Sequence, residues 1–283
     1  MTVGYKVLRF DTPVSQTTST PVAAPVSKET DEEIIDRLRE RFSILDDMTL
    51  AVKKGDVRAM IVSGPPGVGK SFGIEAVLSK ADMFSTLAGK KKKFEIIKGA
   101  VSPICLYQKL YEYSDNKSIL VFDDCDSVLF DELSLNLLKA ALDTSKKRTI
   151  HWNTESRILR ENDLPNSFDF NGGIIFVTNI KFADVKSKKL KDHLEALESR
   201  CHYLDLTIDT EREKMLRIKQ IVTDGLLADY NFTQEEHDEI VDFVDKNRAK
   251  MRELSLRTVI KAAGLRKSMP DRWQRVATLT LMK

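Results

Sequence analysis

The chain has 283 residues, of which 42% are hydrophobic and 31% charged, and it can therefore bury one large core or a medium and a small one. Lys and Arg number 45 against 43 Asp and Glu, so the formal charge is +2 and any nucleic-acid site would have to be a local patch. Three widely spaced cysteines and four scattered histidines argue against a disulfide framework or a structural metal and favour a cytoplasmic protein. Because no apolar run is long enough for a bilayer, no membrane partner is expected.

Residues 1–28 are rich in Ser, Thr, Pro and Val and contain little that could bury a core. They predict a flexible N-terminal arm, either mobile or docked on a partner. A short alternating piece with Tyr5, Val7 and Phe10 has the pattern of a pairing strand. No apolar segment ahead of a cleavage site is seen, so no secretion signal is expected.

Residues 29–207 alternate between helical and strand patterns. Thr30 can cap a first helix with Glu32 and Glu33 in its first turn, and the run 58–62 then reads as a strand between two glycines. Further strands are expected at 94–97, 119–122 and 174–178, and helices at 70–80, 104–113 and 133–142. This alternation predicts an α/β fold, a three-layer sandwich with a central parallel sheet.

Residues 208–283 contain no pattern typical of strands. Amphipathic helices are expected at 210–222, 234–250 and 255–267, the last with Leu256, Val259, Ile260 and Ala263 on one apolar face. They predict a small α-helical lid domain that follows the sheet domain.

A phosphate-binding loop follows the strand 58–62. The pattern G-x-x-x-x-G-K-[ST] is matched by Gly64, Pro65, Pro66, Gly67, Val68, Gly69, Lys70 and Ser71. Glycines let backbone N–H groups approach the phosphates, and the N-terminus of the following helix adds partial positive charge. Lys70 would reach the β- and γ-phosphates of ATP, Ser71 would hold Mg²⁺, and Phe72 completes the predicted binding segment.

A second motif, which is acidic, lies at the end of the strand 119–122. Asp123 and Asp124 follow it directly, and a carboxylate at the end of a buried strand is what a Mg²⁺ site beside a phosphate loop needs. Asp123 would act on the metal, and Asp124 would orient the attacking water as a general base. The alternative, a solvated loop start, is common for an isolated Asp-Asp pair.

With these two motifs the chain resembles the AAA+ ATPase superfamily of P-loop NTPases. Asn179, after the strand 174–178, resembles the polar sensor 1 residue that positions the water. Arg200, in Ser-Arg-Cys, resembles the finger that clamp-loader ATPases insert into a neighbour's site. Arg257, at the start of the 255–267 helix, resembles sensor 2, which touches the γ-phosphate. For Arg200 and Arg257, the alternative is that each is an ordinary surface arginine. The single-module layout is similar to AAA+ proteins of tailed phages, and this resemblance implies the host cytoplasm as the location.

The resemblance implies a homo-oligomeric ring that hydrolyses ATP with Mg²⁺ between subunits and remodels a nucleic-acid or protein substrate. Two departures bear on this. The family usually has Glu where this chain has Asp124, so slow hydrolysis is expected. The loop 99–103 lacks the aromatic-Gly pair with which unfoldases grip a threaded chain. The alternative is a nucleotide-gated module that assembles on DNA or a protein with little turnover.

Two other features carry open interpretations. Lys90–Lys93 and the cluster around Lys188 are either solvated loops or contacts to nucleic-acid phosphates. Between residues 146 and 173, alternating aromatics before an Asn-Gly pair predict a hairpin. Its Arg148, Trp152 and Arg157 are either substrate contacts or residues that fasten the hairpin to the sheet.

Overall fold

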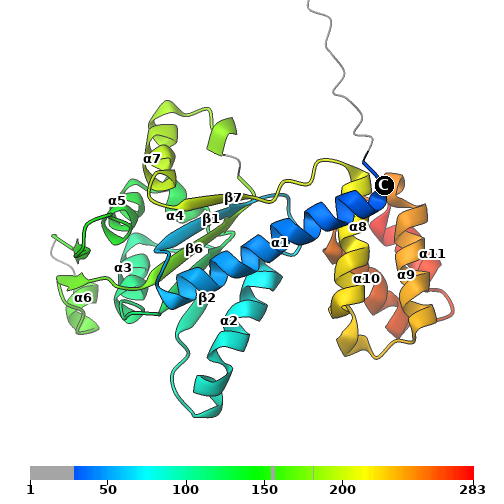
Figure 1. Ribbon diagram of the computed structural model, residues 1–283, viewed down its shortest axis with the longest axis horizontal. Helices are drawn as coiled ribbons and strands as arrows, with labels where there is room; N and C mark the ends of the chain where they lie inside the picture. Colours follow the sequence, from blue (N-terminus) through cyan, green and yellow to red (C-terminus); the bar gives the residue numbers. More distant parts are fainter. Residues whose placement is uncertain (1–28, 154–156, 181) are drawn as a thin grey trace, which may run out of the picture.

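The protein is described here by a computed structural model that covers residues 29–153, 157–180 and 182–283 (Figure 1). The arm predicted for residues 1–28 lies outside the described residues. A five-stranded sheet with the order β2-β3-β6-β1-β7 forms the centre, and every adjacent pair is parallel. Its strands are β1 (Ala59–Ser63), β2 (Phe94–Lys98), β3 (Ile119–Asp123), β6 (Gly173–Thr178) and β7 (His202–Asp205). The parallel sheet predicted from the alternating pattern is confirmed.

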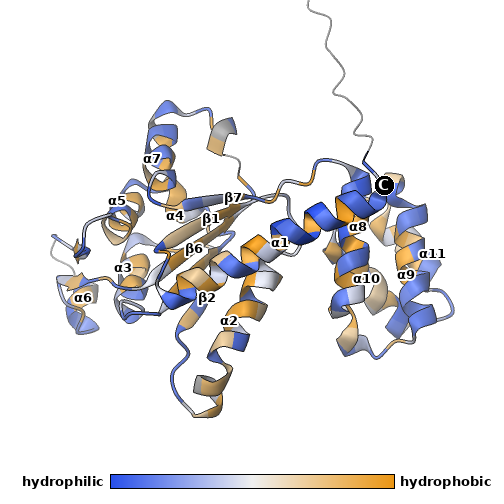
Figure 2. Cartoon of the chain, viewed as in Figure 1, coloured by the Kyte–Doolittle hydropathy of each residue, from blue (hydrophilic) through white to orange (hydrophobic). Residues whose placement is uncertain are grey.

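Helices cover both faces of this sheet, as the pleat of β1 shows. Met60 and Val62 pack with α1 (Asp31–Lys54) and α2 (Lys70–Leu87), whereas Ile61 between them packs on the opposite face. That opposite face is covered by α3 (Pro103–Glu112), α5 (Glu132–Ala141) and α7 (Lys188–Glu198). Figure 2 shows the hydrophobic strands enclosed between helices whose outer faces are largely hydrophilic. The fold is therefore the predicted three-layer α/β sandwich.

The first helix begins as the sequence predicts. Thr30 and Glu33 form a reciprocal capping box, in which each side chain accepts a hydrogen bond from the other residue's backbone N–H. The helix ends at Gly55, whose φ of 87° lies in the left-handed region that glycine adopts at little cost. Both ends of α1 are thus encoded locally.

The edge strand β7 was not predicted from the sequence. Its residues His202–Asp205 are exposed or half-buried, so they lack the apolar run that marks β1, β3 and β6. Pairing with β1 alone holds it in place, from Met60 opposite His202 to Ser63 opposite Asp205. A short edge strand of this kind carries too weak a local pattern to be read from sequence.

A helical unit follows β7. It contains α8 (Glu211–Ile221), α9 (Gln234–Lys246), α10 (Leu256–Ser268) and α11 (Trp273–Leu281), which share one apolar core around Trp273. Its helices lie beside the sheet unit, and α1 extends along both (Figure 1). The last strand ends at Asp205 and α8 starts at Glu211, while the domain boundary at 207/208 stays a prediction.

The hairpin predicted around Asn171-Gly172 exists, but its turn was placed wrongly. The two short strands β4 (Thr149–His151) and β5 (Ser167–Asp169) pair antiparallel, and the connection between them is the longer segment 152–166, which holds α6 (Arg157–Glu161). Asn171-Gly172 instead joins β5 to the central strand β6. Gly172 is needed there because a Cβ would lie 2.3 Å from the carbonyl oxygen of Tyr113. The Asn171-Gly172 pair, which was interpreted as a turn, therefore marks a place where two backbone segments approach closely.

No helix in the described ranges is long and apolar enough to cross a membrane.

Candidate functional site

The phosphate loop lies between the end of β1 and the start of α2. Gly67 and Gly69 adopt φ values of 71° and 100°, which L side chains rarely reach, so the loop needs glycine at both positions. Gly67 is also held from outside, because a Cβ there would lie 2.5 Å from the Cβ of Ser255. The Gly67 carbonyl accepts a hydrogen bond from the Leu256 N–H at 2.9 Å, and this bond attaches the helical unit to the loop.

Lys70 reaches back into the curve of the phosphate loop. Its Nζ donates to the carbonyl oxygens of Gly64 and Pro65 at 2.6 and 2.9 Å and to Asn179 Oδ1 at 2.9 Å. The side chain is buried, and burial lowers the pKa of Lys70 to about 8, an effect that the charges of Asp124 and Asp123 partly offset. The loop therefore holds a cation that an arriving phosphate would stabilise.

Ser71 and Asp123 meet beside this lysine. Ser71 Oγ donates to Asp123 Oδ1 at 2.7 Å, and Asp123 is almost fully buried at the end of β3. A hydroxyl and a carboxylate oxygen suit Mg²⁺, which binds few protein oxygens and completes its shell with water and phosphate. No cluster of three or more His, Cys, Asp or Glu side chains that could hold a metal occurs in the described part of the chain. Ser71 and Asp123 supply two of the oxygens that such a metal would need, and a bound nucleotide would supply others.

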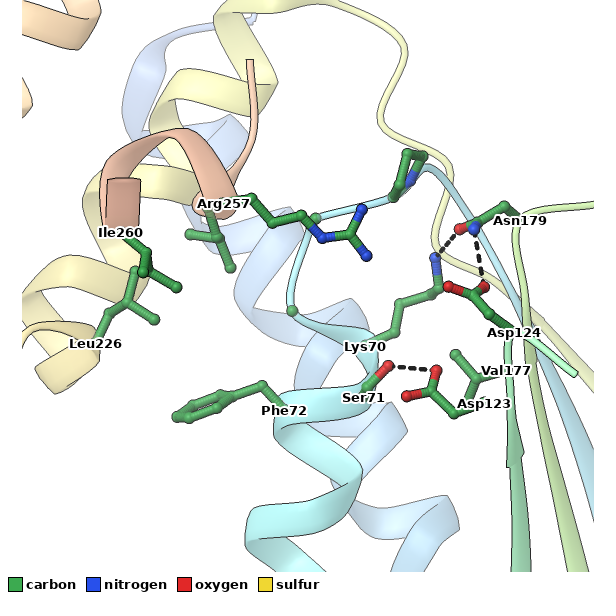
Figure 3. Close-up of a pocket in the computed structure, with 14 residues that line it drawn as sticks. Lys70, Ser71, Phe72, Asp123, Asp124, Val177, Asn179, Leu226, Arg257 and Ile260 are labelled. Carbon is green, nitrogen blue, oxygen red and sulfur yellow. Dashed lines mark hydrogen bonds between the residues drawn. The ribbon is translucent and has the colours of Figure 1, made fainter. Parts of the chain in front are cut away.

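Asp124 and Asn179 form the third part of the site (Figure 3). Asn179 Nδ2 donates to Asp124 Oδ1 at 2.8 Å, so its amide bridges Asp124 and Lys70. Asp124 has a φ of 52°, and its backbone N–H donates to the Val177 carbonyl, which fixes the turn. Burial, and then the nearby charge of Asp123, raises the pKa of Asp124 above its ordinary value. Raised basicity in a carboxylate facing the loop is the property that a proton acceptor needs.

An open pocket extends from these polar groups to the helical unit. One wall consists of the phosphate loop and the ends of β3 and β6, and the other belongs to α10 and the turn after α8 (Figure 3). Its lining residues are Pro66, Gly67, Gly69, Lys70, Ser71, Phe72, Asp123, Asp124, Val177, Asn179, Leu226, Leu256, Arg257 and Ile260. The Arg257 guanidinium points from α10 toward Lys70 and the two carboxylates (Figure 3). The structure therefore brings Lys70, Ser71, Phe72, Asp123, Asp124, Asn179 and Arg257 together around one cavity.

Arg200 lies elsewhere. It follows α7 and immediately precedes β7, whereas the pocket is built where β1, β3 and β6 end. Because the strands are parallel, Arg200 lies at the N-terminal ends of the strands, whereas the pocket lies at their C-terminal ends. Its Nη1 donates to the Ala196 carbonyl in its own helix turn. Arg200 thus cannot serve the pocket of its own chain in this arrangement.

Four residues that line the pocket were not predicted as site residues, namely Val177, Leu226, Leu256 and Ile260. Leu226 is the last residue of a π-helical turn at Val222–Leu226, which no pattern predicted. Ile260 was placed on the core face of its helix, but its side chain is half exposed and faces the pocket (Figure 3). Lys98, at the end of β2, does not line the pocket, but its Nζ lies 3.4 Å from Asp123 Oδ2. The sequence signal for Ile260 is weak, because it is simply an apolar residue that directly follows Val259 of the buried face.

Arg217 on α8 ties the helical unit to the sheet unit from behind the loop. Its guanidinium lies 3.4 Å from the ring centroid of Phe42 on α1, and its Nε donates to the Val68 carbonyl at 3.5 Å. Burial lowers the pKa of Arg217 to about 10. Arg217 therefore connects α8, α1 and the phosphate loop.

Packing accounts for two of the three candidate substrate contacts in the hairpin, Arg148 and Trp152, but not for Arg157. Arg148 is buried and donates to the carbonyls of Ala141 and Gly172, and Trp152 packs edge-on against Tyr107 of α3. Phe168 also packs edge-on against Tyr107. Arg157 is exposed and paired with Glu161 on the same helix. The aromatics thus fasten the hairpin to α3, which favours the second of the two interpretations.

Comparison with known proteins gives one sequence relative and a group of distant folds. No protein-family model matches the chain. An uncharacterised 36.7 kDa protein from the nrdC–mobD intergenic region of Enterobacteria phage T4 is 33% identical over 254 residues, which cover 89% of this chain and 76% of that protein.

Among solved structures, domain III of the replication initiation protein DnaA from Thermotoga maritima aligns with a TM-score of 0.47 at 12% identity, over 85% of this chain and 92% of that one. DnaA bound to AMPPCP and single-stranded DNA aligns at 0.45 and 14%, over 83% and 61%. NtrX from Brucella abortus in complex with ATP aligns at 0.49 and 13%, over 89% and 55%. This chain spans less than two thirds of the last two, and at such identities and TM-scores none of the three decides a ligand, reaction or partner.

Proposed function

The chain belongs to the same family as the phage T4 protein. We propose that it is a P-loop nucleotide-binding module of the AAA+ type and that it hydrolyses ATP with Mg²⁺ at a site shared between neighbouring copies. The observation that carries the proposal is the hydrogen-bonded set Lys70–Asn179–Asp124 beside Ser71–Asp123. This set places a phosphate-binding cation, a proton acceptor and two metal-suited oxygens around one pocket.

Each residue has a role that follows from its chemistry. The loop N–H groups and Lys70 bind the phosphates, and Lys70 exchanges its two carbonyl contacts for phosphate oxygens. Ser71 and Asp123 would hold Mg²⁺, which supplies charge neutralisation at the phosphates when bound. Asp124, oriented by Asn179, accepts the proton of the attacking water. Arg257 adds positive charge from the helical unit.

The position of Arg200 supports the shared site. It lies away from its own pocket at the edge where the strands begin, so only a second copy can receive its charge at the phosphates. An arginine supplied in trans accelerates hydrolysis by roughly 10³–10⁵ in well-studied GTPases. ATP turnover therefore requires a homo-oligomer, which we propose is a ring.

The direct test is steady-state ATPase rate against protein concentration, with Lys70→Ala as the blank. Specific activity should rise steeply with concentration, because a lone monomer lacks Arg200 at its pocket. Constant specific activity across the dilution series would refute the shared site. Mixing Arg200→Ala with Lys70→Ala chains, each nearly inactive alone, should restore part of the rate because some mixed pairs hold one complete site.

The object of this activity is a nucleic-acid or protein substrate that the oligomer remodels. Adding single-stranded and double-stranded DNA to the same assay separates the two classes. Stimulation by DNA would assign a nucleic-acid substrate, whereas indifference to DNA would point to a protein partner.

A second candidate function is favoured by one residue. Asp124 has a shorter side chain than the usual Glu, and Asn179 holds its carboxylate at 2.8 Å. A nucleotide-gated module would bind ATP and assemble on DNA or a protein with little turnover. Turnover far below one per minute together with ATP-dependent assembly would select it. In that case Asp124→Glu should raise the rate, because it moves the carboxylate toward the pocket.

A further inference from the structure

The far end of α2 carries an exposed apolar surface. Met83, Phe84 and Leu87 are exposed there, with Phe84 and Leu87 each at 77%. A groove beside them is lined in part by Met83, Leu87 and Phe94, and Lys92 also lines it. Figure 2 shows this end of α2 as hydrophobic and the loop that follows it as hydrophilic. A group of exposed apolar side chains beside a groove marks an interaction site.

The loop after α2 adds a run of positive charge to this surface. Lys90–Lys93 are all exposed. Lys91 and Lys92 lie over the rings of Tyr113 and Phe94, with 5.2 and 5.7 Å between Nζ and the ring centroid. Because the rings hold these two ammonium groups in place, the lysines lose less side-chain freedom when they bind an anion.

A buried carboxylate joins the lysine run to two other basic segments. Asp82 on α2 is 4% exposed, and it accepts the Lys93 N–H at 2.7 Å and pairs with Lys53 Nζ at 2.6 Å. Lys53 Nζ also donates to the Lys117 carbonyl at 3.4 Å. The end of α1, the lysine run and the segment before β3 are therefore neighbours at the N-terminal ends of β2 and β3.

The acids near these segments leave an excess of positive charge. Asp82 is paired as described, and the half-buried Glu112 pairs with Lys109 at 3.0 Å. The exposed acids within residues 53–56, 82–93 and 112–117 are Asp56 and Asp115. The same ranges hold six exposed lysines, namely Lys54, Lys90, Lys91, Lys92, Lys93 and Lys117. We call these six lysines together with Met83, Phe84 and Leu87 the basic surface.

We propose that the basic surface binds single-stranded nucleic acid. Lysines on three separate segments suit a uniform chain of phosphates, because such a chain offers negative charge wherever a lysine lies. Phe84 and Leu87 are exposed beside them, and unpaired bases can stack on such side chains, whereas the bases of a duplex are stacked inside it. Positive charge beside an exposed aromatic ring is the combination that binds single strands without sequence preference.

The basic surface and the nucleotide pocket lie at the two ends of one helix. α2 begins at Lys70 in the phosphate loop and ends at Leu87 in the basic surface. A movement of the loop on nucleotide binding would therefore reach the bound strand through a single rigid element. The inference deepens the proposed function by naming its class of substrate, and it rests on that function for what ATP hydrolysis acts on.

Fluorescence anisotropy with a labelled oligothymidylate of about 20 nucleotides tests the lysines. Lys90→Gln/Lys93→Gln removes two charges and spares the two lysines that lie over rings. Lys250→Gln/Lys261→Gln removes two exposed charges of the helical unit and is the matched control. The first variant should bind about tenfold more weakly, and its plot of log Kd against log salt should flatten by about 0.7 for each lysine removed. Equal changes in both variants would overturn the assigned surface.

A matched pair of phenylalanines tests the contact with bases. Phe84→Ala should weaken oligothymidylate binding by about fivefold or more, because a stacked base loses its ring. Phe130, in α4 (Ser127–Phe130), is half exposed and follows the end of β3, so Phe130→Ala should leave binding unchanged. A duplex of the same length should bind wild type more weakly than the single strand. A duplex that binds as tightly as the single strand would overturn the contact with bases.

Two further probes identify the anion. Oligouridylate in the same assay separates RNA from DNA: binding of either or both supports the proposal, and a preference assigns the source of the strand. Poly-L-glutamate stands in for an acidic protein. If it displaces the oligonucleotide at equal charge concentration and Phe84→Ala has no effect, the surface binds an acidic protein and the nucleic-acid proposal is overturned.

The outcomes are separable from the ATPase proposal, because the binding assay needs no hydrolysis. If wild-type chains hydrolyse ATP cooperatively but bind no oligonucleotide with or without ATP, the basic surface is wrong and the proposed function stands. If binding follows Lys90, Lys93 and Phe84 but no turnover above Lys70→Ala occurs, the basic surface stands and the proposed function fails.

Discussion

The two walls of the pocket are built on different principles. On the sheet side, polar groups are already hydrogen-bonded to one another, as Lys70, Asn179 and Asp124 show. On the helical side, Leu226 and Ile260 are apolar and belong to turns and helix faces rather than to strand ends. The polar wall must hold several charges at fixed positions, whereas the helical wall adds one charge, from Arg257, to apolar side chains that contribute shape. Mutations in the two walls should therefore affect different steps.

The largest expected effect comes from the polar wall. Asp124→Asn removes the proton acceptor but preserves the side-chain size, so the hydrolysis rate should fall by about 10²–10⁴-fold while ATP still binds. Single-turnover hydrolysis and fluorescent-nucleotide binding measure the two steps. Asp126→Asn is the matched control, because Asp126 Oδ1 accepts the Thr178 hydroxyl and Asp126 does not line the pocket. Equal losses in both variants would remove the assigned role of Asp124.

Titration of Lys70 gives an intermediate effect. Its lowered pKa of about 8 means that the free site loses its positive charge as the pH rises above 8. Bound phosphate would raise this pKa again, so ATP binding above pH 8 should take up a proton. Affinity should be flat below pH 8 and fall above it, approaching tenfold per pH unit. Calorimetry in buffers of different ionisation enthalpy measures the uptake, and Lys70→Met should show weaker binding without the slope.

The apolar wall should give the smallest effect. Ile260→Ala shortens a half-exposed side chain at the pocket and should weaken ATP binding by about tenfold or less. The rate of the bound complex should change little, because no polar group moves. Inorganic tripolyphosphate, which lacks a base and sugar, should bind Ile260→Ala and wild type equally. A loss that appears equally for tripolyphosphate would mean that the two walls are not separable.

The same contrast explains what the sequence could reveal. Lys70, Ser71 and Asp123 were predictable because phosphate and metal binding demand particular residue types at strand ends, and the parallel sheet brings those ends together. Ile260 was assigned to the core because helical periodicity cannot distinguish a side chain facing a core from one facing a pocket.

Tertiary context limited the fold prediction in the same way. The strand β7 depends on its pairing with β1, and the segment Asn171-Gly172 is shaped by the nearby Tyr113 carbonyl rather than by a turn. Neither constraint is visible in a local pattern, because each partner is far away in the chain. Thr30, in contrast, was read correctly, since its capping partner Glu33 is three residues away.

The hydrogen bond from the Leu256 N–H to the Gly67 carbonyl makes the phosphate loop and the helical unit a single coupled element. Whatever shifts the loop as it receives a nucleotide must also strain or release this bond. Thermodynamic linkage makes such coupling reciprocal, so a partner that moves α10 would change ATP affinity by the same factor with which ATP changes the partner's affinity. The helical unit could in this way both respond to nucleotide occupancy and change the affinity for ATP.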